Sequence, residues 1–323
     1  MPTPDLNLTT HSILTTHGTI HVLDTGTPPD QIKHPLPTLL LLHGNSSCSK
    51  IFLPLIHLSL TSSTTLRQYR ILALDLPGHG SSSDAPDPVE TSYTQPAYAD
   101  AAVQVLNTLG VLQDDADGVV VLGWSLGGHN AIEMVARLGD ASGRRIKGIM
   151  ITGTPPALGL EQVQKGFGSL GLQDEAAPEK TDGGKKGDEE EGHVNLAGTE
   201  KWSERDYDQF PFEAARGERA PWIRETAVRT DGRARRIMFE AFEAGRGVDQ
   251  VKLVEENDVP CAVVNGGDEP FVNLDYLDSL KYKNLWEGKC HRLPGLGHAP
   301  FWEEPETFLP YWERFVKHCS KEA

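Results

Sequence analysis

One glycine-rich segment constrains this chain more than any other: residues 122–128, which read LGWSLGG. It follows the apolar run Gly118–Val121 and precedes a helical pattern from His129 to Leu138. A serine at the tip of such a strand–turn–helix takes a strained backbone conformation that projects its hydroxyl beyond the strand. The pattern predicts this turn at Ser125, with glycines at 123 and 127 because a side chain there would collide with a neighbouring strand or helix. The alternative is an ordinary glycine-rich turn that carries a serine.

Apolar runs that can form buried strands recur along the chain, each followed by a turn. Alternation over residues 12–24 predicts a β-hairpin. Helical patterns are expected at Gln95–Leu109 and Phe301–His318. Strands that alternate with helices imply a mostly parallel sheet covered on both faces. The remaining predicted strands are Thr38–Leu42, Tyr69–Leu76, Ile146–Thr152, Cys261–Val264 and Cys290–Leu293.

The alternation stops after the strand at Ile146–Thr152. Residues 157–255 hold helical patterns without a convincing buried strand, so we expect a core of 1–154 and 256–323 with a helical cap of 155–255 over the carboxyl edge of the sheet. Within the cap, residues 174–191 contain eight acidic and three basic residues and almost nothing apolar. We expect this stretch to form a disordered or mobile loop. Short cap helices are expected at Trp202–Ala215, Ala220–Val228 and Gly232–Phe242.

Composition narrows the possible partners and location. A net charge of −16 at pH 7 argues against binding nucleic acid or an anionic membrane through bulk electrostatics. No apolar run approaches the roughly 20 residues that span a bilayer, and residues 1–10 lack the features of a signal peptide. The four cysteines have no paired spacing, which is typical of a reducing compartment. We expect a cytoplasmic protein that acts on a small molecule, with an oligomeric state that the sequence leaves unknown.

Candidate catalytic side chains follow the ends of separate predicted strands. Ser125 is the candidate nucleophile and His298 the candidate base, which would later protonate the leaving group. Both Asp268 and Glu269 follow the strand at Cys261 and are candidates for the acid. The chain order serine, acid, histidine is that of the α/β hydrolases, as distinct from the two serine-protease orders. We therefore predict an α/β-hydrolase fold with a mostly parallel central sheet and an inserted helical cap.

The choice of acid depends on register. Hydrolase-fold chains commonly place glycine, two residues, the acid, two residues and valine at this loop, and Gly266, Glu269 and Val272 fit that spacing. Glu269 is therefore preferred, and Asp268 is interpreted as a carboxylate that caps the loop locally.

An oxyanion hole needs two N–H donors aimed at one point. Leu126 N–H supplies one, and Asn45 N–H is placed to supply the other. The Asn45 side chain either bonds substrate or forms the turn. Three further histidines are interpreted as structural: His43, His79 and His129. Arg233, Arg235 and Arg236 are interpreted as a solvated helix face rather than an anion site.

Histidines and cysteines lack the spacing of metal ligands, so no metal or cofactor is expected.

At these residues the chain resembles the metal-independent N-acyl-homoserine lactonases of the α/β-hydrolase fold, bacterial quorum-quenching enzymes. The resemblance covers nearly everything from about Leu14, and its most specific segments are 150–156 (MITGTPP) and 235–240 (RRIMFE). It implies a triad of Ser125, Glu269 and His298 and maps the family's oxyanion-loop asparagine onto Asn45. A cap tyrosine that contacts the lactone maps onto Phe210, where the hydroxyl is lost. Tyr207, one turn earlier, is a candidate substitute.

The leading hypothesis is a serine hydrolase that opens a lactone ring, with N-acyl-homoserine lactone as the favoured substrate. The alternatives are a general carboxylesterase, a lactonase for another ring, and a slow hydrolase-fold receptor. Four apolar cap residues are interpreted mainly as packing, with contact to an acyl chain as the alternative: Trp222, Ile223, Met238 and Phe242.

Overall fold

A computed structural model describes five stretches of the chain: residues 6–28, 36–113, 116–138, 145–167 and 193–320. The acidic segment 174–191 lies outside the described residues. The described part forms one sheet in the strand order β1-β2-β4-β3-β5-β6-β7-β8. The strands are β1 (Thr9–Thr15), β2 (Gly18–Asp24), β3 (Thr38–Leu42), β4 (Ile71–Leu74), β5 (Val119–Trp124), β6 (Ile146–Thr152), β7 (Cys261–Gly266) and β8 (His291–Leu293).

Strand pairing confirms the expected mostly parallel sheet. The β1–β2 hairpin is antiparallel, and β2 pairs antiparallel with β4. Every other neighbouring pair, from β4–β3 to β7–β8, is parallel. The carboxyl ends of β3, β5, β6, β7 and β8 therefore meet at one edge, where the candidate residues were expected.

Uninterrupted apolar strands arise because the sheet is buried on both faces. In β3, Leu40 and Leu42 belong to one apolar cluster, whereas Leu39 and Leu41 belong to the cluster on the opposite face. Side chains of a strand alternate between faces, so consecutive leucines are needed to fill both cores.

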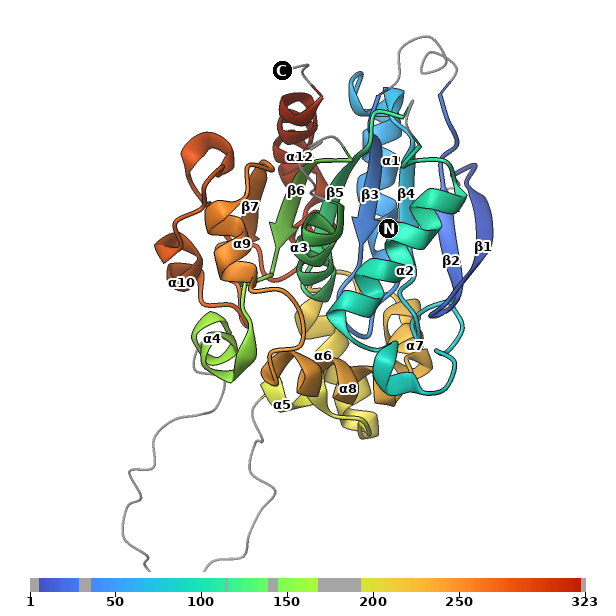
Figure 1. The fold of residues 1–323 in the computed structure, drawn as a ribbon, viewed down its shortest axis with the longest axis vertical. Coiled ribbons are helices and arrows are strands. Elements are labelled where there is room, and N and C mark those ends of the chain that lie inside the picture. The colour runs from blue at the N-terminus through green and yellow to red at the C-terminus, as the bar shows by residue number, and fades with distance from the viewer. Residues whose placement is uncertain (1–5, 29–35, 114–115, 139–144, 168–192, 321–323) are drawn as a thin grey trace, which may run out of the picture.

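Helices cover both faces of the sheet (Figure 1). One cluster includes side chains of α2, α3, α9 and α10, and the other those of α1, α11 and α12. Neither α1 nor α10 was expected from the sequence. The single helix expected at Phe301–His318 is two helices, with Pro305 at the start of the second. The bounds are α1 (Leu53–Thr61), α2 (Gln95–Thr108), α3 (Leu126–Leu138), α9 (Gln250–Glu256), α10 (Leu274–Ser279), α11 (Pro300–Glu303) and α12 (Pro305–Cys319), with short 3₁₀ helices at Ser49–Phe52, Leu66–Gln68, Val89–Thr91 and Trp286–Gly288.

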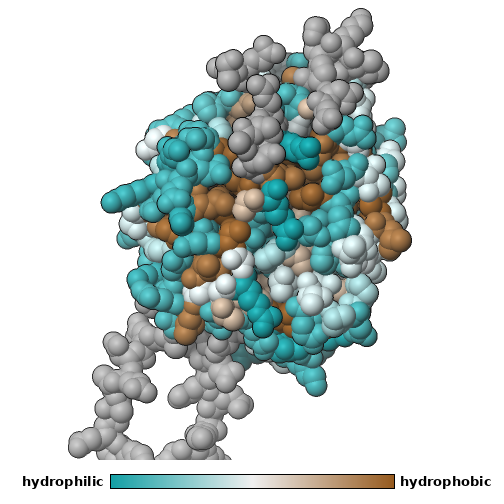
Figure 2. Space-filling view, in the orientation of Figure 1, coloured by the Kyte–Doolittle hydropathy of each residue, from teal (hydrophilic) through white to brown (hydrophobic). Residues whose placement is uncertain are grey.

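Of the six helices that the structure describes between β6 and β7, all but α9 lie beyond the carboxyl ends of the strands, at the bottom of Figure 1, and are called the cap helices below. Three of them begin at residues suited to a helix start: Ser203 and Asp206 form a capping box before α6, Pro221 opens α7, and the Asp231 carboxylate caps α8. In Figure 2 the lower part of this face is mostly teal and white, so polar residues prevail on this side of the cap helices. The cap helices are α4 (Gly159–Gly166), α5 (His193–Gly198), α6 (Glu204–Ala214), α7 (Pro221–Arg229) and α8 (Gly232–Glu243).

Candidate active site

Ser125 occupies the strained turn between β5 and α3. Its φ is +53°, a left-handed conformation that few non-glycine residues adopt. The turn is held by hydrogen bonds at both backbone groups: Ser125 N–H donates to the Thr152 carbonyl (2.9 Å), and its own carbonyl accepts from the Thr154 hydroxyl (2.8 Å). A Cβ at Gly123 would collide with the backbone of Gly127, which explains the glycine there. The strand–turn–helix prediction is confirmed.

His298 and Glu269 form a buried pair. His298 Nδ1 lies 2.8 and 2.9 Å from the two carboxylate oxygens of Glu269, and the side chains are 5% and 0% exposed. Phe271 N–H also donates to this carboxylate (2.9 Å), which fixes its orientation. Asp268 is exposed. The structure therefore brings Glu269, rather than Asp268, to the imidazole.

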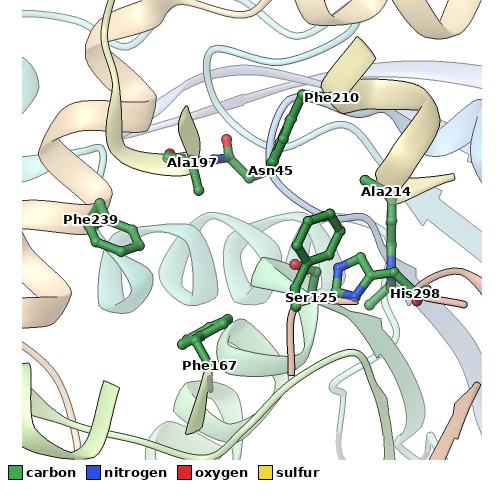
Figure 3. Close-up of a pocket in the computed structure, with 11 residues that line it drawn as sticks. Asn45, Ser125, Phe167, Ala197, Phe210, Ala214, Phe239 and His298 are labelled. Carbon is green, nitrogen blue, oxygen red and sulfur yellow. Dashed lines mark hydrogen bonds between the residues drawn. The ribbon is translucent and has the colours of Figure 1, made fainter. Parts of the chain in front are cut away.

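The imidazole of His298 is packed so that its second nitrogen stays available. Because Nδ1 faces Glu269, Nε2 is left for another partner. The indole N–H of Trp124 donates to the His298 carbonyl (2.9 Å), and the Phe271 ring lies edge-on to the imidazole at 5.0 Å. A Cβ at Gly153 would lie 2.5 Å from the imidazole, so only glycine leaves room for this ring. Ser125 and His298 line the same cavity and are drawn next to each other in Figure 3.

That cavity is small and aromatic. It encloses about 70 Å³ between the sheet edge and the cap helices, and its polar side chains are Asn45, Ser125 and His298. An aromatic wall around a nucleophile suits a substrate with apolar groups near its reactive carbonyl. The sequence analysis did not single out Phe167, Phe239 or Phe271, because no periodicity tells a cavity-lining aromatic from a core one. The apolar lining consists of Trp124, Phe167, Ala197, Phe210, Ala214, Phe239 and Phe271.

The two residues predicted to supply the oxyanion hole lie at the ends of β3 and β5. Leu126 is the first residue of α3, so its N–H has no acceptor one turn earlier in the helix. Asn45 lies on the loop after β3 and lines the cavity. Its side chain has a role that the sequence analysis did not consider: Nδ2 donates to the Ala197 carbonyl of α5 (2.7 Å) and so joins the sheet edge to the cap helices.

The three histidines interpreted as structural, His43, His79 and His129, are buried. His43 donates from Nδ1 to the Gly44 carbonyl (2.7 Å) and accepts the Leu76 N–H at Nε2 (2.9 Å), which fixes it as neutral. His129 donates to Gln250 Oε1 (2.8 Å). Burial lowers the pKa of His129 to about 4 and the pKa of His79 to about 3.

Phe210 lines the cavity, with its ring 5.2 Å from Trp202 and 5.7 Å from Phe271. Tyr207 faces elsewhere: its ring packs on Trp202, and its hydroxyl accepts from Arg235 at 3.5 Å. Tyr207 is absent from the lining formed by the described residues. The suggestion that Tyr207 replaces the missing hydroxyl is therefore wrong.

The interpretation of Arg235 as part of a solvated face is also wrong. Its side chain is 1% exposed and sits over the Trp202 ring at 4.3 Å. The guanidinium donates to the carbonyls of Thr199 (3.0 Å) and Glu200 (3.1 Å), and to the Ser46 hydroxyl (3.3 Å) on the loop after β3. Burial lowers its pKa, and these acceptors satisfy its donors. Its neighbours Arg233 and Arg236 form partly exposed ion pairs, in line with the expected solvated face.

The four apolar residues considered for an acyl chain pack elsewhere. Trp222 contacts Trp302 (5.5 Å), and Phe242 contacts His129 (4.7 Å). Ile223 and Met238 are buried in two separate apolar clusters. Within the described residues, no cluster of three His, Cys, Asp or Glu side chains could hold a metal ion. The same part of the chain contains no helix long and apolar enough to cross a membrane.

The alpha/beta hydrolase family matches residues 39–310. The crystal structure of the N-acyl homoserine lactonase AidH complexed with N-butanoyl homoserine is 39% identical, with a TM-score of 0.79 and 98% of each chain covered. The esterase RhEst1 from Rhodococcus sp. ECU1013 is 22% identical (TM-score 0.65; 96% of this chain and 98% of that chain). A putative lipase from Acinetobacter baumannii AYE is 15% identical (TM-score 0.72; 97% and 92%). Among curated protein sequences, none matches.

The likeness to AidH extends over nearly the whole chain and confirms the resemblance to these lactonases. The esterase and the putative lipase share the fold at lower identity. The chain belongs to the alpha/beta hydrolase family and is an ester hydrolase.

Proposed function

We propose that this protein is a serine hydrolase that opens a lactone ring, most readily that of an N-acyl-homoserine lactone, with Ser125, His298 and Glu269 as its triad. One observation carries the proposal: the buried contact of 2.8 Å between His298 Nδ1 and Glu269, beside a serine held in a left-handed turn. A buried carboxylate on Nδ1 selects the tautomer in which Nε2 accepts a proton.

The first half of the reaction forms an acyl-enzyme. Ser125 Oγ attacks the lactone carbonyl while His298 Nε2 takes its proton. The N–H groups of Leu126 and Asn45 donate to the oxyanion of the tetrahedral intermediate. The intermediate collapses, the ring C–O bond breaks, and His298 returns the proton to the leaving alkoxide.

The second half uses one water. His298 removes a proton from the water, which attacks the acyl-enzyme, and Ser125 leaves with that proton to give the hydroxy acid. In a lactone the alkoxide stays tethered to the acyl group and can close the ring again. Prompt protonation by His298 therefore matters more here than in an ordinary esterase.

The choice of substrate is supported by the similarity to AidH and by the side chains that line the cavity. AidH was crystallised with N-butanoyl homoserine, and this chain is 39% identical to it over 98% of its length. The four phenylalanines of the cavity suit the apolar part of such a molecule. A second candidate, an ester or lactone without an amide, is favoured by Phe210, because this cavity wall has no hydroxyl at that position.

The proposal also covers the domain organisation around the site and the compartment in which the protein acts. Residues 155–255, apart from α9 on the face of the sheet, act as a cap on a core of 1–154 and 256–323, and the partner is a small molecule in the cytoplasm. The net charge of −16 supports this assignment over a nucleic-acid partner.

Hydrolysis of a substrate panel by the wild type and by Ser125→Ala tests the proposal. The panel holds N-acyl-homoserine lactones of short and long chain, aliphatic lactones and nitrophenyl esters. We expect turnover of lactones, and a loss of about 10⁴-fold or more in kcat for Ser125→Ala. The exposed Ser62→Ala serves as the matched control and retains wild-type rates. Turnover by Ser125→Ala at the wild-type rate would refute the triad, and turnover of simple esters alone would refute the lactonase assignment.

A further inference from the structure

The loop that carries His298 is held by Glu303 through the backbone on both sides of the histidine. Gly297 N–H donates to Glu303 Oε2 (2.8 Å), and Ala299 N–H donates to Glu303 Oε1 (3.2 Å). The Glu303 side chain is 7% exposed. One buried carboxylate therefore accepts from the residue before and the residue after the candidate base. Hydrogen bonds to a charged acceptor are stronger than neutral ones.

Arg216, just beyond cap helix α6, contacts this arrangement. Its Nε is shielded from solvent and lies 3.6 Å from Glu303 Oε2. Its Nη2 donates to the Asp268 carbonyl (3.5 Å), one residue before Glu269. A Cβ at Gly297 would lie 2.5 Å from both nitrogens, so the guanidinium packs directly on the backbone next to His298.

Helix capping alone accounts for only part of this arrangement. Ala299 is the N-cap of α11, so its bond to Glu303 stabilises the first turn of that helix. The bond from Gly297 and the contact with Arg216 add nothing to the cap. They fix the backbone at Gly297, the residue before His298, and connect it to Asp268, the residue before Glu269.

We infer that Glu303 and Arg216 are a positioning pair, which holds the backbone of the base and of the acid in register for proton transfer. The inference rests on the proposed triad. Neither residue lines the cavity formed by the described residues, so neither is placed to bind substrate. Displacement of a catalytic group by about 1 Å can cost about 100-fold in rate. Loss of the pair should therefore lower kcat and leave KM almost unchanged.

The test measures kcat and KM with a nitrophenyl ester for Glu303→Ala, Glu303→Gln, Arg216→Ala and the double variant. We expect kcat to fall about 100-fold for Glu303→Ala and about 10-fold for Arg216→Ala, with KM within about twofold. Because the two residues act together, adding Arg216→Ala to Glu303→Ala should cost less than a further twofold. The matched controls are Glu306→Gln, on the exposed first turn of α12, and Arg205→Ala, on the exposed face of α6; both retain wild-type kcat.

Chemical rescue separates positioning from stability. Arg216 is 43% exposed, so its removal leaves a gap open to solvent, and added guanidinium ion should restore part of the kcat of Arg216→Ala. The same ion should not help the double variant. A purely structural role would lower the melting temperature without this rescue.

Each result decides the inference. The inference is overturned if the single variants keep kcat within twofold of the controls. It is also overturned if only KM rises, or if guanidinium does not rescue Arg216→Ala. If Glu303→Ala does not fold, the kcat of Glu303→Gln and the rescue of Arg216→Ala still test the inference. If the wild type shows no Ser125-dependent turnover of any lactone or ester in the panel, the proposed function has failed instead.

Discussion

The turn at Ser125 and the interior of the cap helices are held by opposite means. At the turn, glycines let main chain approach main chain: a Cβ at Gly127 would collide with the carbonyls of Leu42 and His43. Among the cap helices, by contrast, one long side chain joins separate segments, because Arg235 donates to their carbonyls. The sheet edge therefore depends on the absence of side chains, whereas the cap helices depend on one charged side chain whose donors are all bonded.

The largest effect is expected at the sheet edge, from replacing the candidate acid. Glu269→Gln keeps the shape but lets the amide donate to Nδ1, which favours the wrong tautomer, so kcat should fall by about 10⁴-fold. Asp268→Asn is the matched control, because Asp268 is exposed. Steady-state rates on one ester suffice, and a larger loss for Asp268→Asn than for Glu269→Gln would exchange their roles.

Adding one methyl group at Gly127 tests how tightly neighbouring backbone packs against the turn. Gly127→Ala should lower the free energy of unfolding by about 3 kcal/mol or more, because neighbouring backbone cannot move aside cheaply. Gly288→Ala is the control: its Cβ would meet nothing within 4 Å, and only its positive φ costs about 1 kcal/mol. Urea unfolding measures both variants, and equal losses would show that the turn is no more crowded than an open loop.

Among the cap helices, removing the buried charge tests the other half of the comparison. Arg235→Met leaves the carbonyls of Thr199 and Glu200 without their donor, and we expect a loss of about 3 kcal/mol in unfolding free energy. Arg236→Met, in a partly exposed ion pair, should cost less than about 1 kcal/mol. The same urea titration gives both values. A loss for Arg235→Met no larger than that for Arg236→Met would mean that the cap helices do not depend on this arginine.

This contrast explains what the sequence could predict. Strand bounds for Thr38–Leu42 and Ile146–Thr152 agree with the structure, because a buried parallel strand needs a continuous apolar run bounded by turns. The turn at Ser125 was also predictable, since its glycines lie next to the serine in the chain. Helix α1 was missed because its sequence, LPLIHLSLT, has no clear polar face, and residues of it such as Leu55 are buried.

Long-range contacts were beyond sequence reasoning. Arg235 is only 1% exposed because its acceptors come from residues 199, 200 and 227, which no local pattern brings together. The spacing around Glu269 favoured it over Asp268 but could not show which carboxylate faces His298. Likewise, the bond from Asn45 to Ala197 joins residues 152 positions apart.

The effect that varies with pH is expected at His129, which touches both regions because it lies on α3 against Phe242 of α8. Burial lowers its pKa in the folded chain to about 4, from the ordinary histidine value of 6.5 that holds when the chain is unfolded. Between these values the unfolded chain binds the extra proton. The stability due to neutral His129 is therefore fully present above pH 6.5 and is lost as the pH falls towards 4.

His129→Gln should therefore flatten the fall of unfolding free energy between pH 6.5 and 4, by up to about 1.4 kcal/mol per pH unit. The exposed His318→Gln should leave that slope unchanged. Urea unfolding at several pH values measures it. An unchanged slope for His129→Gln would mean that His129 takes up its proton in the folded state as readily as in the unfolded one.

The most direct test of the central claim, that Ser125 is a nucleophile activated by His298, is covalent labelling with a fluorophosphonate, located by mass spectrometry. We predict one label per chain, on Ser125, with a rate at least about 10³-fold lower in His298→Ala. No label on Ser125, or labelling of His298→Ala as fast as the wild type, would contradict the account.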